Sequence, residues 1–457
     1  MPDLPQEQTF TYRGGSPKRV RPRTVDDGTM PASVRQAILD RITGGDPDAA
    51  RALLDGVDAL LSPAARAEWR QRIAWSYYIE NRDPQALGIA QTVSAGSGPW
   101  VAEGDWVAGL AAWRLADCAT AGTYFERSAT GASNAELRSA ALYWASRAAM
   151  RCRHPERTAD LLRAAAANDE TLYGMLAAQQ LGRDLPNLAR QVEFSDADWK
   201  RLKDSENVHV AVALTEIGRD ELASEVLIHE AKLAGPGDFA ALSRLARELG
   251  LPQTQLYLAY NAPTGANPDP ASRYPAPKWA PVNGWQVDPA LAFAHTLQES
   301  AFRGTAVSPA SAQGLMQITP ITVRQFAPRL GLSASDVNIF DPGTNLAFGQ
   351  ENLEMLRDSP ATQGKLPKIM AAYNAGLTPV TRWNDQVNNQ GDPLLYMESI
   401  PYWETRGYVA TVMRNYWMYE RQARAASPTR EALAANAWPM FPDAGRGGRV
   451  YLTADKD

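Results

Sequence analysis

The sequence predicts an all-α protein in which an α-superhelix of helical pairs precedes a second helical domain. The chain has 457 residues, of which 45% are hydrophobic and 21% are charged, a composition typical of globular proteins with two or three domains. Residues 31–261 are rich in Ala and Leu at helical spacing. Residues 262–281 then carry six prolines and no periodic pattern, which indicates a semi-rigid linker between domains.

The superhelix is predicted from short polar breaks that interrupt the helical pattern. Residues 1–30, rich in Pro, Arg, Gly and Thr, come first and are expected to form an extended arm. The breaks NRDP, LADC, RCRHP and IGRD follow at a spacing near that of helical-pair repeats. Each pair can bury its apolar face only against its neighbours, so a ring-like superhelix is expected. Its aromatic residues should pack in the core; these are Trp75, Trp106, Trp113, Tyr143 and Trp144.

The second domain is assigned to residues 282–425, with a tail at 426–457 that includes WPMFP and GRGGR. Apolar residues at helical spacing predict its helices. The tail could pack on the body or bind a partner. The predicted helices cover 289–301, 319–330, 345–359, 367–374 and 400–424.

Composition argues against several classes of function. The net charge of -5 is small and both signs are interspersed, so a nucleic-acid partner is not expected. The chain has no apolar run long enough for a membrane span, and Met1 opens onto PDLPQ with no hydrophobic signal segment. We therefore expect either a cytosolic protein or one whose signal has been removed. The four histidines are scattered and no Cys/His cluster exists, so neither a metal site nor a cofactor is expected.

The position of one carboxylate, Glu299, suits a group that donates a proton. Apolar residues at helical spacing place it in the last turn of a helix, where the dipole and burial would both disfavour its ionised form. The following stretch, from Ser300 to Ser335, contains no Asp or Glu. On this window alone, a partly solvated helix-end glutamate is the simpler interpretation. His295, one turn earlier, is assigned no role.

Four motifs change that interpretation because they occur in a fixed order. They are QESAF around Glu299, SPASAQGLMQITP, AAYNAG and ESIPYWETRGYV. Each motif is weak alone, but the ordered set is specific. The chain resembles the soluble lytic murein transglycosylases of glycoside hydrolase family 23. That resemblance implies a lysozyme-like catalytic domain preceded by a ring-shaped superhelix.

The resemblance also implies an activity and a set of site residues. It implies a periplasmic lytic exotransglycosylase, a lyase that cleaves the β-1,4 bond between N-acetylmuramic acid and N-acetylglucosamine in peptidoglycan and leaves 1,6-anhydromuramoyl ends. Its partners would be the glycan strands, and protein partners are not identified. Glu299 would be the catalytic acid and then the base, while Glu398 would be more structural. The substrate-binding residues would be Ser308, Gln317, Tyr373, Asn374 and Glu404.

Two other functions remain open at this stage: a lysozyme-type peptidoglycan hydrolase and a noncatalytic superhelical scaffold. Plainer interpretations of the site residues are a turn at GLMQI, a helix C-cap at Tyr373 and Asn374, and a salt bridge at Glu398 or Glu404. An exported protein would meet oxidants. Because Cys118 and Cys152 lie at corresponding breaks of neighbouring pairs, we predict a disulfide between them.

Overall fold

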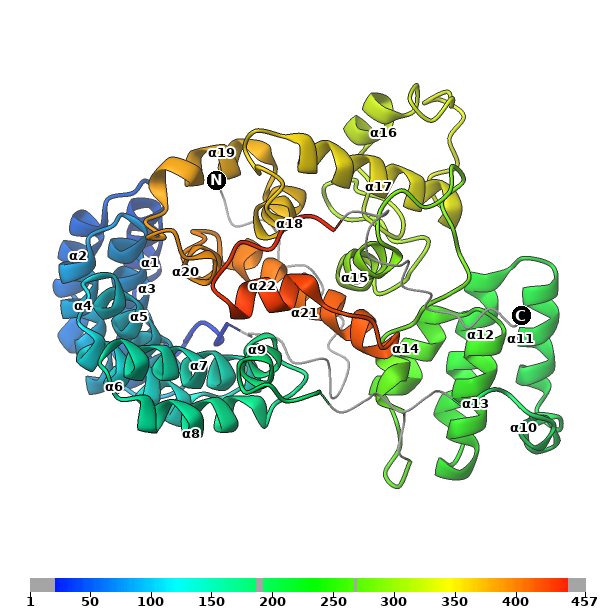
Figure 1. Cartoon of the computed structure of the whole chain (residues 1–457), viewed down its shortest axis with the longest axis horizontal. Helices are drawn as coiled ribbons and strands as arrows, with labels where there is room; N and C mark the ends of the chain where they lie inside the picture. The colour runs from blue at the N-terminus through cyan, green and yellow to red at the C-terminus, as the bar shows by residue number, and fades with distance from the viewer. Residues whose placement is uncertain (1–20, 186–191, 267–268, 443–457) are drawn as a thin grey trace.

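The computed structural model describes residues 21–185, 192–266 and 269–442, and these residues form an all-α structure (Figure 1). Within these ranges, β pairing is limited to three isolated bridges. Helices α1–α9 curve along one side of the molecule and α10–α14 stand at the other, with α15–α22 between and above them (Figure 1). The predicted fold class, a helical superhelix followed by a second helical domain, is confirmed.

The first array is a series of antiparallel helices, each packed on the next. The breaks NRDP, LADC and RCRHP separate successive helices of this array, as predicted. Several helices begin at a side chain that accepts a backbone N–H, such as Asp117 and Asn134. The helices are α1 (Ala32–Thr43), α2 (Pro47–Asp55), α3 (Pro63–Ile79), α4 (Asp83–Thr92), α5 (Trp100–Arg114), α6 (Cys118–Gly131), α7 (Ala135–Arg151), α8 (Pro155–Ala166) and α9 (Leu172–Gln180).

The second array packs around a hydrophobic core of its own, whereas the first array shares one continuous core with the C-terminal domain. The region predicted as one superhelical unit thus contains two arrays with separate cores. The break IGRD lies between two helices of this array, as predicted. The helices are α10 (Asp196–Leu202), α11 (Glu206–Glu216), α12 (Asp220–Leu233), α13 (Pro236–Glu248) and α14 (Pro252–Tyr260).

Aromatic side chains fill the core of the first array. The indole of Trp144 meets Trp106 and Trp113 edge-on, with ring centroids 6.5 Å and 5.3 Å apart. The predicted packing role is confirmed for these residues and for Tyr143, while Trp75 is partly buried beneath the Arg406 guanidinium. The predicted disulfide between Cys118 and Cys152 is also present, with Cα atoms 5.6 Å apart.

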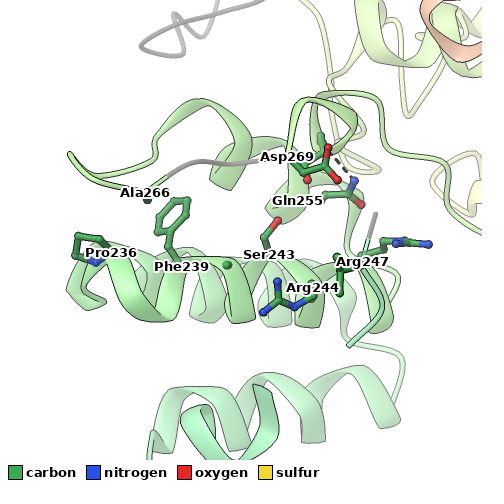
Figure 2. A pocket seen from close by; sticks show the side chains of 11 residues that line it. Pro236, Phe239, Ser243, Arg244, Arg247, Gln255, Ala266 and Asp269 are labelled. Atoms are coloured by element: carbon green, nitrogen blue, oxygen red, sulfur yellow. Dashed lines mark hydrogen bonds between the residues drawn. The ribbon is translucent and has the colours of Figure 1, made fainter. Parts of the chain in front are cut away.

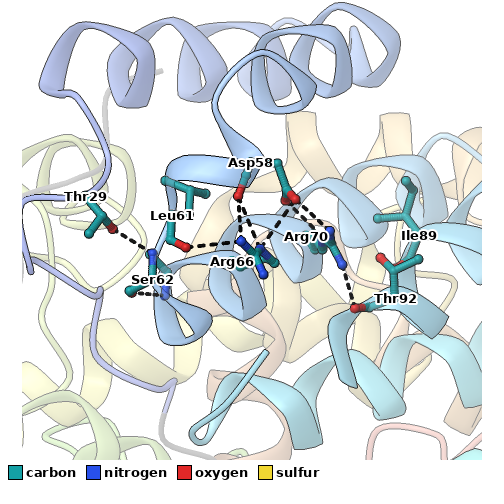
Figure 3. Close-up of polar contacts among 9 residues, drawn as sticks. Thr29, Asp58, Leu61, Ser62, Arg66, Arg70, Ile89 and Thr92 are labelled. Atoms are coloured by element: carbon teal, nitrogen blue, oxygen red, sulfur yellow. Dashed lines mark hydrogen bonds and ion pairs between the residues drawn. The ribbon is translucent and has the colours of Figure 1, made fainter. Parts of the chain in front are cut away.

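Polar contacts hold the start of the first array (Figure 3). Asp58 accepts hydrogen bonds from Arg70, and the backbone carbonyl of Asp58 accepts from Arg66. The extended residues before α1 lie against the same array, because the backbone N–H of Ser62 donates to Thr29 at 3.1 Å and Trp100 donates to the carbonyl of Arg23 at 3.0 Å. Residues 21–30 of the predicted arm therefore pack along the array, and residues 1–20 lie outside the described residues.

The C-terminal domain contains the predicted helices and three further ones, α19, α20 and α22. Two of these, α20 and α22, have six and seven residues, so periodicity separates them poorly from turns. The α20 helix and the α22 helix each begin at a proline, which suits the first turn of a helix. The helices are α15 (Pro289–Glu299), α16 (Pro320–Phe326), α17 (Pro342–Asp358), α18 (Leu366–Ala375), α19 (Leu377–Gln386), α20 (Pro393–Glu398), α21 (Trp403–Gln422) and α22 (Pro428–Ala434).

The long helix α21 supports α15 along its length. Tyr416 on α21 donates to Asp288, the N-cap residue of α15, at 2.9 Å, and Asn415 donates to the carbonyl of Ala294 at 3.4 Å. The linker also lies on α21, since Tyr419 donates to the carbonyl of Pro275 at 2.8 Å. These contacts fix the direction in which α15 runs and therefore where its last residue lies.

Buried polar contacts join the first array to the C-terminal domain. Tyr173 on α9 donates to Glu398 at 2.7 Å, and Arg147 on α7 pairs with Asp392 at 2.5 Å. Tail residues pack back on the domain as well, because Leu366 donates its backbone N–H to the carbonyl of Pro439 at 2.8 Å. The WPMFP part of the tail is thus packed, and GRGGR lies outside the described residues. No helix in the described parts of the chain is long and apolar enough to cross a bilayer.

The packing of α21 generates a prediction about pH. Burial raises the pKa of Glu420, on α21, from the ordinary value of 4.5 to about 8. Because the folded state holds this proton more tightly than the unfolded chain, its contribution to stability is complete below pH 4.5 and is lost as the pH rises to about 8. Glu420→Gln should remove that loss, which is at most about 5 kcal/mol.

Chemical denaturation at pH 5 and pH 9 measures the effect. The Glu420→Gln variant should match wild type at pH 5 and be more stable at pH 9. Glu431→Gln, at an exposed position on α22, should show the same pH dependence as wild type. An identical decline in the Glu420→Gln variant would contradict the assignment.

Candidate active site

Glu299 lies in the last turn of α15, as predicted, and is its last residue, so the helix ends two residues before the predicted Ala301. The chain leaves the helix because Ala301 and Phe302 adopt left-handed backbone angles, with φ of 50° and 62°. Phe302 and Met316 are buried beside this turn, and the side chain of Glu299 is partly exposed. A carboxyl group at this helix end can meet both the protein interior and a substrate.

Tyr408 on α21 contacts the carboxyl group of Glu299 directly. Its hydroxyl donates to Oε1 of Glu299 at 2.5 Å and lies 2.8 Å from Nδ1 of His295. The side chain of His295 is fully buried, and burial lowers its pKa to about 3. No role was expected for His295 from the sequence, and Tyr408 was not singled out. The structure joins the histidine to Glu299 through one hydroxyl group.

The loop formed by the GLMQ motif lies next to this group and is anchored by a buried asparagine, Asn345. Its Oδ1 accepts from the backbone N–H of Met316 at 2.8 Å, and its Nδ2 donates to the carbonyls of Gln313 and Ile339 at 3.0 Å and 2.8 Å. Gly314 has φ of +75°, and a Cβ there would lie 2.1 Å from Nδ2 of Asn345. Only glycine fits this close approach.

Two residues predicted to bind substrate also hold the loop together. The Nε2 of Gln317 donates to the carbonyls of Gly314 and Ala306 at 2.9 Å and 3.3 Å, which leaves its Oε1 as the atom that can meet a ligand. The hydroxyl of Ser308 accepts from the backbone N–H of Ala312 at 3.1 Å. The turn predicted at GLMQI is therefore present, and Ser308 belongs to the same loop.

Tyr373, on α18, links the loop to the acid. Its hydroxyl donates to the carbonyl of Met316 at 2.8 Å, and its ring lies 4.6 Å from that of His295. Burial and the neighbouring negative charge of Glu299 raise the pKa of Tyr373 well above its ordinary value. The phenol therefore stays protonated near neutral pH and acts as a fixed donor to the loop.

The remaining predicted residues lie either on the C-terminal domain near Tyr373 or at the contact with the first array. Asn374, next to Tyr373, accepts from the hydroxyl of Thr405 at 2.6 Å. Glu404 precedes Thr405 in the first turn of α21 and is exposed, so it lies near Asn374 and one turn before Tyr408. Glu398 is buried and accepts from Tyr173 of the first array. The structure thus gives Glu398 a structural contact and leaves Glu404 accessible to a ligand.

The described residues contain no group of three His, Cys, Asp or Glu side chains placed to hold a metal ion. A cavity of about 120 Å³ lies elsewhere, between α13, α14 and the linker (Figure 2). Its walls include Phe239, Ser243, Gln255 and Asp269, and none of the predicted site residues lines it. Among the groups near Glu299 are the phenol of Tyr408 and, through it, the imidazole of His295.

Comparison with known proteins finds a family model that matches the region around Glu299. Residues 280–395 match the model of the transglycosylase SLT domain. The soluble lytic murein transglycosylase of Escherichia coli K12 is 32% identical over 159 residues, which cover 34% of this chain and 24% of the relative. A putative soluble lytic murein transglycosylase of Haemophilus influenzae is 29% identical over 274 residues, covering 56% of this chain and 43% of the relative.

Solved structures extend the likeness of fold to most of the chain. An inactive variant of the lytic transglycosylase Slt of Pseudomonas aeruginosa superposes with a TM-score of 0.67 at 22% identity, covering 89% of this chain and 65% of that chain. The 70 kDa soluble lytic transglycosylase of Escherichia coli gives 0.66 at 20% identity, covering 92% and 66%. Residues 280–395 therefore resemble the corresponding domain of the soluble lytic transglycosylases, and most of the chain has their helical fold. The sequence match spans about a quarter of the length of the curated Escherichia coli relative.

The loop anchor generates a stability prediction. Asn345→Leu keeps the side chain's approximate size but leaves the buried N–H of Met316 and two buried carbonyls without their partner. The variant should lose about 3 kcal/mol of unfolding free energy in chemical denaturation, the effect expected when buried polar groups are orphaned. Asn388→Leu, at an exposed position, should change stability by less than about 0.5 kcal/mol. Equal stability of the two variants would show that Asn345 does not anchor the loop.

Proposed function

We propose that this chain is a lytic transglycosylase of peptidoglycan, in which Glu299 serves first as the acid and then as the base. The observation that carries the proposal is the geometry of Glu299, a partly exposed helix-end carboxyl group held at Oε1 by Tyr408 in an SLT domain. The curated relatives of this domain are named soluble lytic murein transglycosylases, and this chain covers less than half of each.

The first step is protonation of the glycosidic oxygen between N-acetylmuramic acid and N-acetylglucosamine. Most glycosidases pair the acid with a second carboxylate, and substrate-assisted enzymes are exceptions. The chain supplies no carboxylate from Ser300 to Ser335, so the developing cation is met best by the acetamido oxygen of the substrate's own muramoyl residue, which forms an oxazolinium-like intermediate. The bond from C1 to the leaving oxygen breaks as Glu299 gives up its proton.

The second step returns a proton to Glu299. The ionised carboxylate removes the proton of the C6 hydroxyl on the same sugar. That oxygen attacks C1 and closes a 1,6-anhydro ring, while the bond from C1 to the acetamido oxygen breaks and the acetamido group is restored. An attacking group within the substrate has a high effective concentration, so it competes with water when the cleft excludes solvent. The hydroxyl of Tyr408 donates a hydrogen bond to Oε1 of Glu299 and so stabilises the carboxylate during this step.

The remaining site residues are proposed to bind the glycan. The carboxylate of Glu404 and the Oε1 of Gln317 would accept hydrogen bonds from sugar hydroxyl groups. The side-chain amide of Asn374 would bind the glycan as well. Ser308 and Tyr373 keep the loop in place beside the acid. Because peptidoglycan lies outside the cytoplasm, we also propose that the protein works in the periplasm.

A lysozyme-type hydrolase remains the second candidate, because Glu404 is a further carboxylate at the start of α21. Digestion of peptidoglycan in ¹⁸O-labelled water separates the two functions. The transglycosylase should yield 1,6-anhydro ends that carry no label. Labelled reducing ends as the main product would establish a hydrolase, and no release of muropeptides would leave the scaffold function.

Substitution of the acid tests its role. Glu299→Gln keeps the shape of the side chain but cannot donate or accept the reacting proton, so release of muropeptides should fall by at least about 100-fold. Binding to purified peptidoglycan in a sedimentation assay should persist. Cleavage at the wild-type rate by a folded Glu299→Gln variant would exclude Glu299 as the acid.

Two conservative substitutions test the supporting residues. Tyr373→Phe removes the donor to Met316, and Glu404→Gln removes one charge, so each should lower kcat/KM by about 10-fold to 100-fold without unfolding the protein. Tyr124→Phe on α6, far from the site in sequence and fold, serves as the matched control. Wild-type turnover in both variants would limit these residues to structural roles.

A further inference from the structure

His295 lies on the protein side of the acid, joined to it through a single hydroxyl group. It precedes Glu299 by one turn of α15, and its side chain is fully buried. Nδ1 of His295, the hydroxyl of Tyr408 and Oε1 of Glu299 form a hydrogen-bonded chain with distances of 2.8 Å and 2.5 Å. No motif that indicated the function includes His295, so its role has to be argued from these contacts.

The imidazole of His295 stays neutral over the working pH range. Burial lowers its pKa to about 3, and the rings of Tyr373 on α18 and Tyr408 on α21 pack against it at 4.6 Å and 5.9 Å. The titratable groups around it are these two tyrosines and Glu299 on its own helix. Since a neutral imidazole has one N–H, the position of that proton decides what His295 can do.

The direction of the hydrogen bonds fixes that proton on Nδ1. The hydroxyl of Tyr408 has one proton, which it donates to Oε1 of Glu299. Its oxygen must therefore accept from His295, so Nδ1 carries the hydrogen. Nε2 is buried and makes no hydrogen bond to a protein group in the described residues, which suits a bare lone pair better than an N–H, because orphaned buried donors are rarer than orphaned acceptors.

We propose that His295 is a positioning residue that holds the hydroxyl of Tyr408 as a donor to Oε1 of Glu299 and so places the acid proton of Glu299 on Oε2. With Nδ1–H donated to Tyr408, the hydroxyl cannot turn back toward the histidine. Oε1 then accepts a hydrogen bond in both protonation states of Glu299. When Glu299 is an acid, its proton occupies the other oxygen, where it is not shared with Tyr408.

The inference rests on the proposed function for its consequence in catalysis but not for its geometry. An acid proton on Oε2 is available to the glycosidic oxygen, and the donor at Oε1 supports the carboxylate that remains. Loss of the Nδ1–H would let Tyr408 accept from a protonated Oε1, which withdraws the proton from the substrate. It would also weaken the support for the ionised form, so Glu299 would lose its proton at a higher pH.

Nuclear magnetic resonance of wild-type protein carrying ¹⁵N-histidine tests the geometry without any activity. The chain has only four histidines, so the His295→Asn spectrum identifies the signal of His295. The result expected is a single ring N–H on Nδ1, unchanged from pH 5 to pH 9. A proton on Nε2, or a ring that becomes doubly protonated in this range, would overturn the proposal.

The catalytic consequence is tested with His295→Leu and His295→Asn, and with His229→Leu at an exposed position on α12 as the control. The Leu variant should lower kcat by about 10-fold with little change in KM, and the alkaline limb of its pH profile should move to higher pH. The Asn variant, whose amide can donate to Tyr408, should recover part of the rate and the wild-type limb.

The outcomes separate this inference from the proposed function. If wild type releases anhydro ends but a folded His295→Leu variant keeps the wild-type pH profile and kcat, His295 has only a packing role and this inference fails alone. If wild type releases no muropeptides, the proposed function fails, and the tautomer measurement still decides the geometry. If His295→Leu does not fold, the resonance experiment on wild type remains decisive.

Discussion

The crossing of α15 and α21 is the constraint on which the site depends. The α15 helix is held at its start, where Tyr416 donates to its N-cap residue Asp288, and at its end, where Tyr408 donates to Glu299. Both tyrosines project from one face of α21. Because hydrogen bonds join α15 to α21 at both ends of α15, they fix the position of the carboxyl group of Glu299 relative to α21. A helix end is a suitable place for an acid, since the following residues leave the helix and expose it.

The other parts of the fold hold this crossing in place. The loop with Gly314 is held by hydrogen bonds to Asn345 and Tyr373, and the ring of Tyr373 also packs against His295. On the opposite side, the first helical array shares a hydrophobic core with the C-terminal domain, and Tyr173 reaches Glu398 just before α21 begins. The array is thus part of the support for α21, in contrast to α10–α14, which pack around their own core.

Much of this arrangement could be predicted from the sequence, because it depends on local patterns. Helical spacing and polar breaks located most helices, and the position of Glu299 in the last turn of a helix followed from the apolar residues before it. Contacts between distant segments could not be read in the same way. Asn345 looks like an ordinary polar residue at the start of a helix, and its role depends on a glycine 31 positions earlier whose missing Cβ makes room for it. Tyr408 was within a quoted motif, but its partner lies on another helix. His295 was set aside because a lone histidine is usually packed, and it is packed, although one of its nitrogens reaches Tyr408.

The most direct test of the account is a crystal structure of the Glu299→Gln variant with a peptidoglycan fragment bound. The account predicts that the glycosidic oxygen lies within hydrogen-bond distance of the residue 299 side chain, on the side away from Tyr408, with the acetamido group of the muramoyl residue below C1 and sugar hydroxyl groups near Glu404 and Gln317. A glycan bound away from residue 299, or a water molecule held between a second carboxylate and C1, would contradict it.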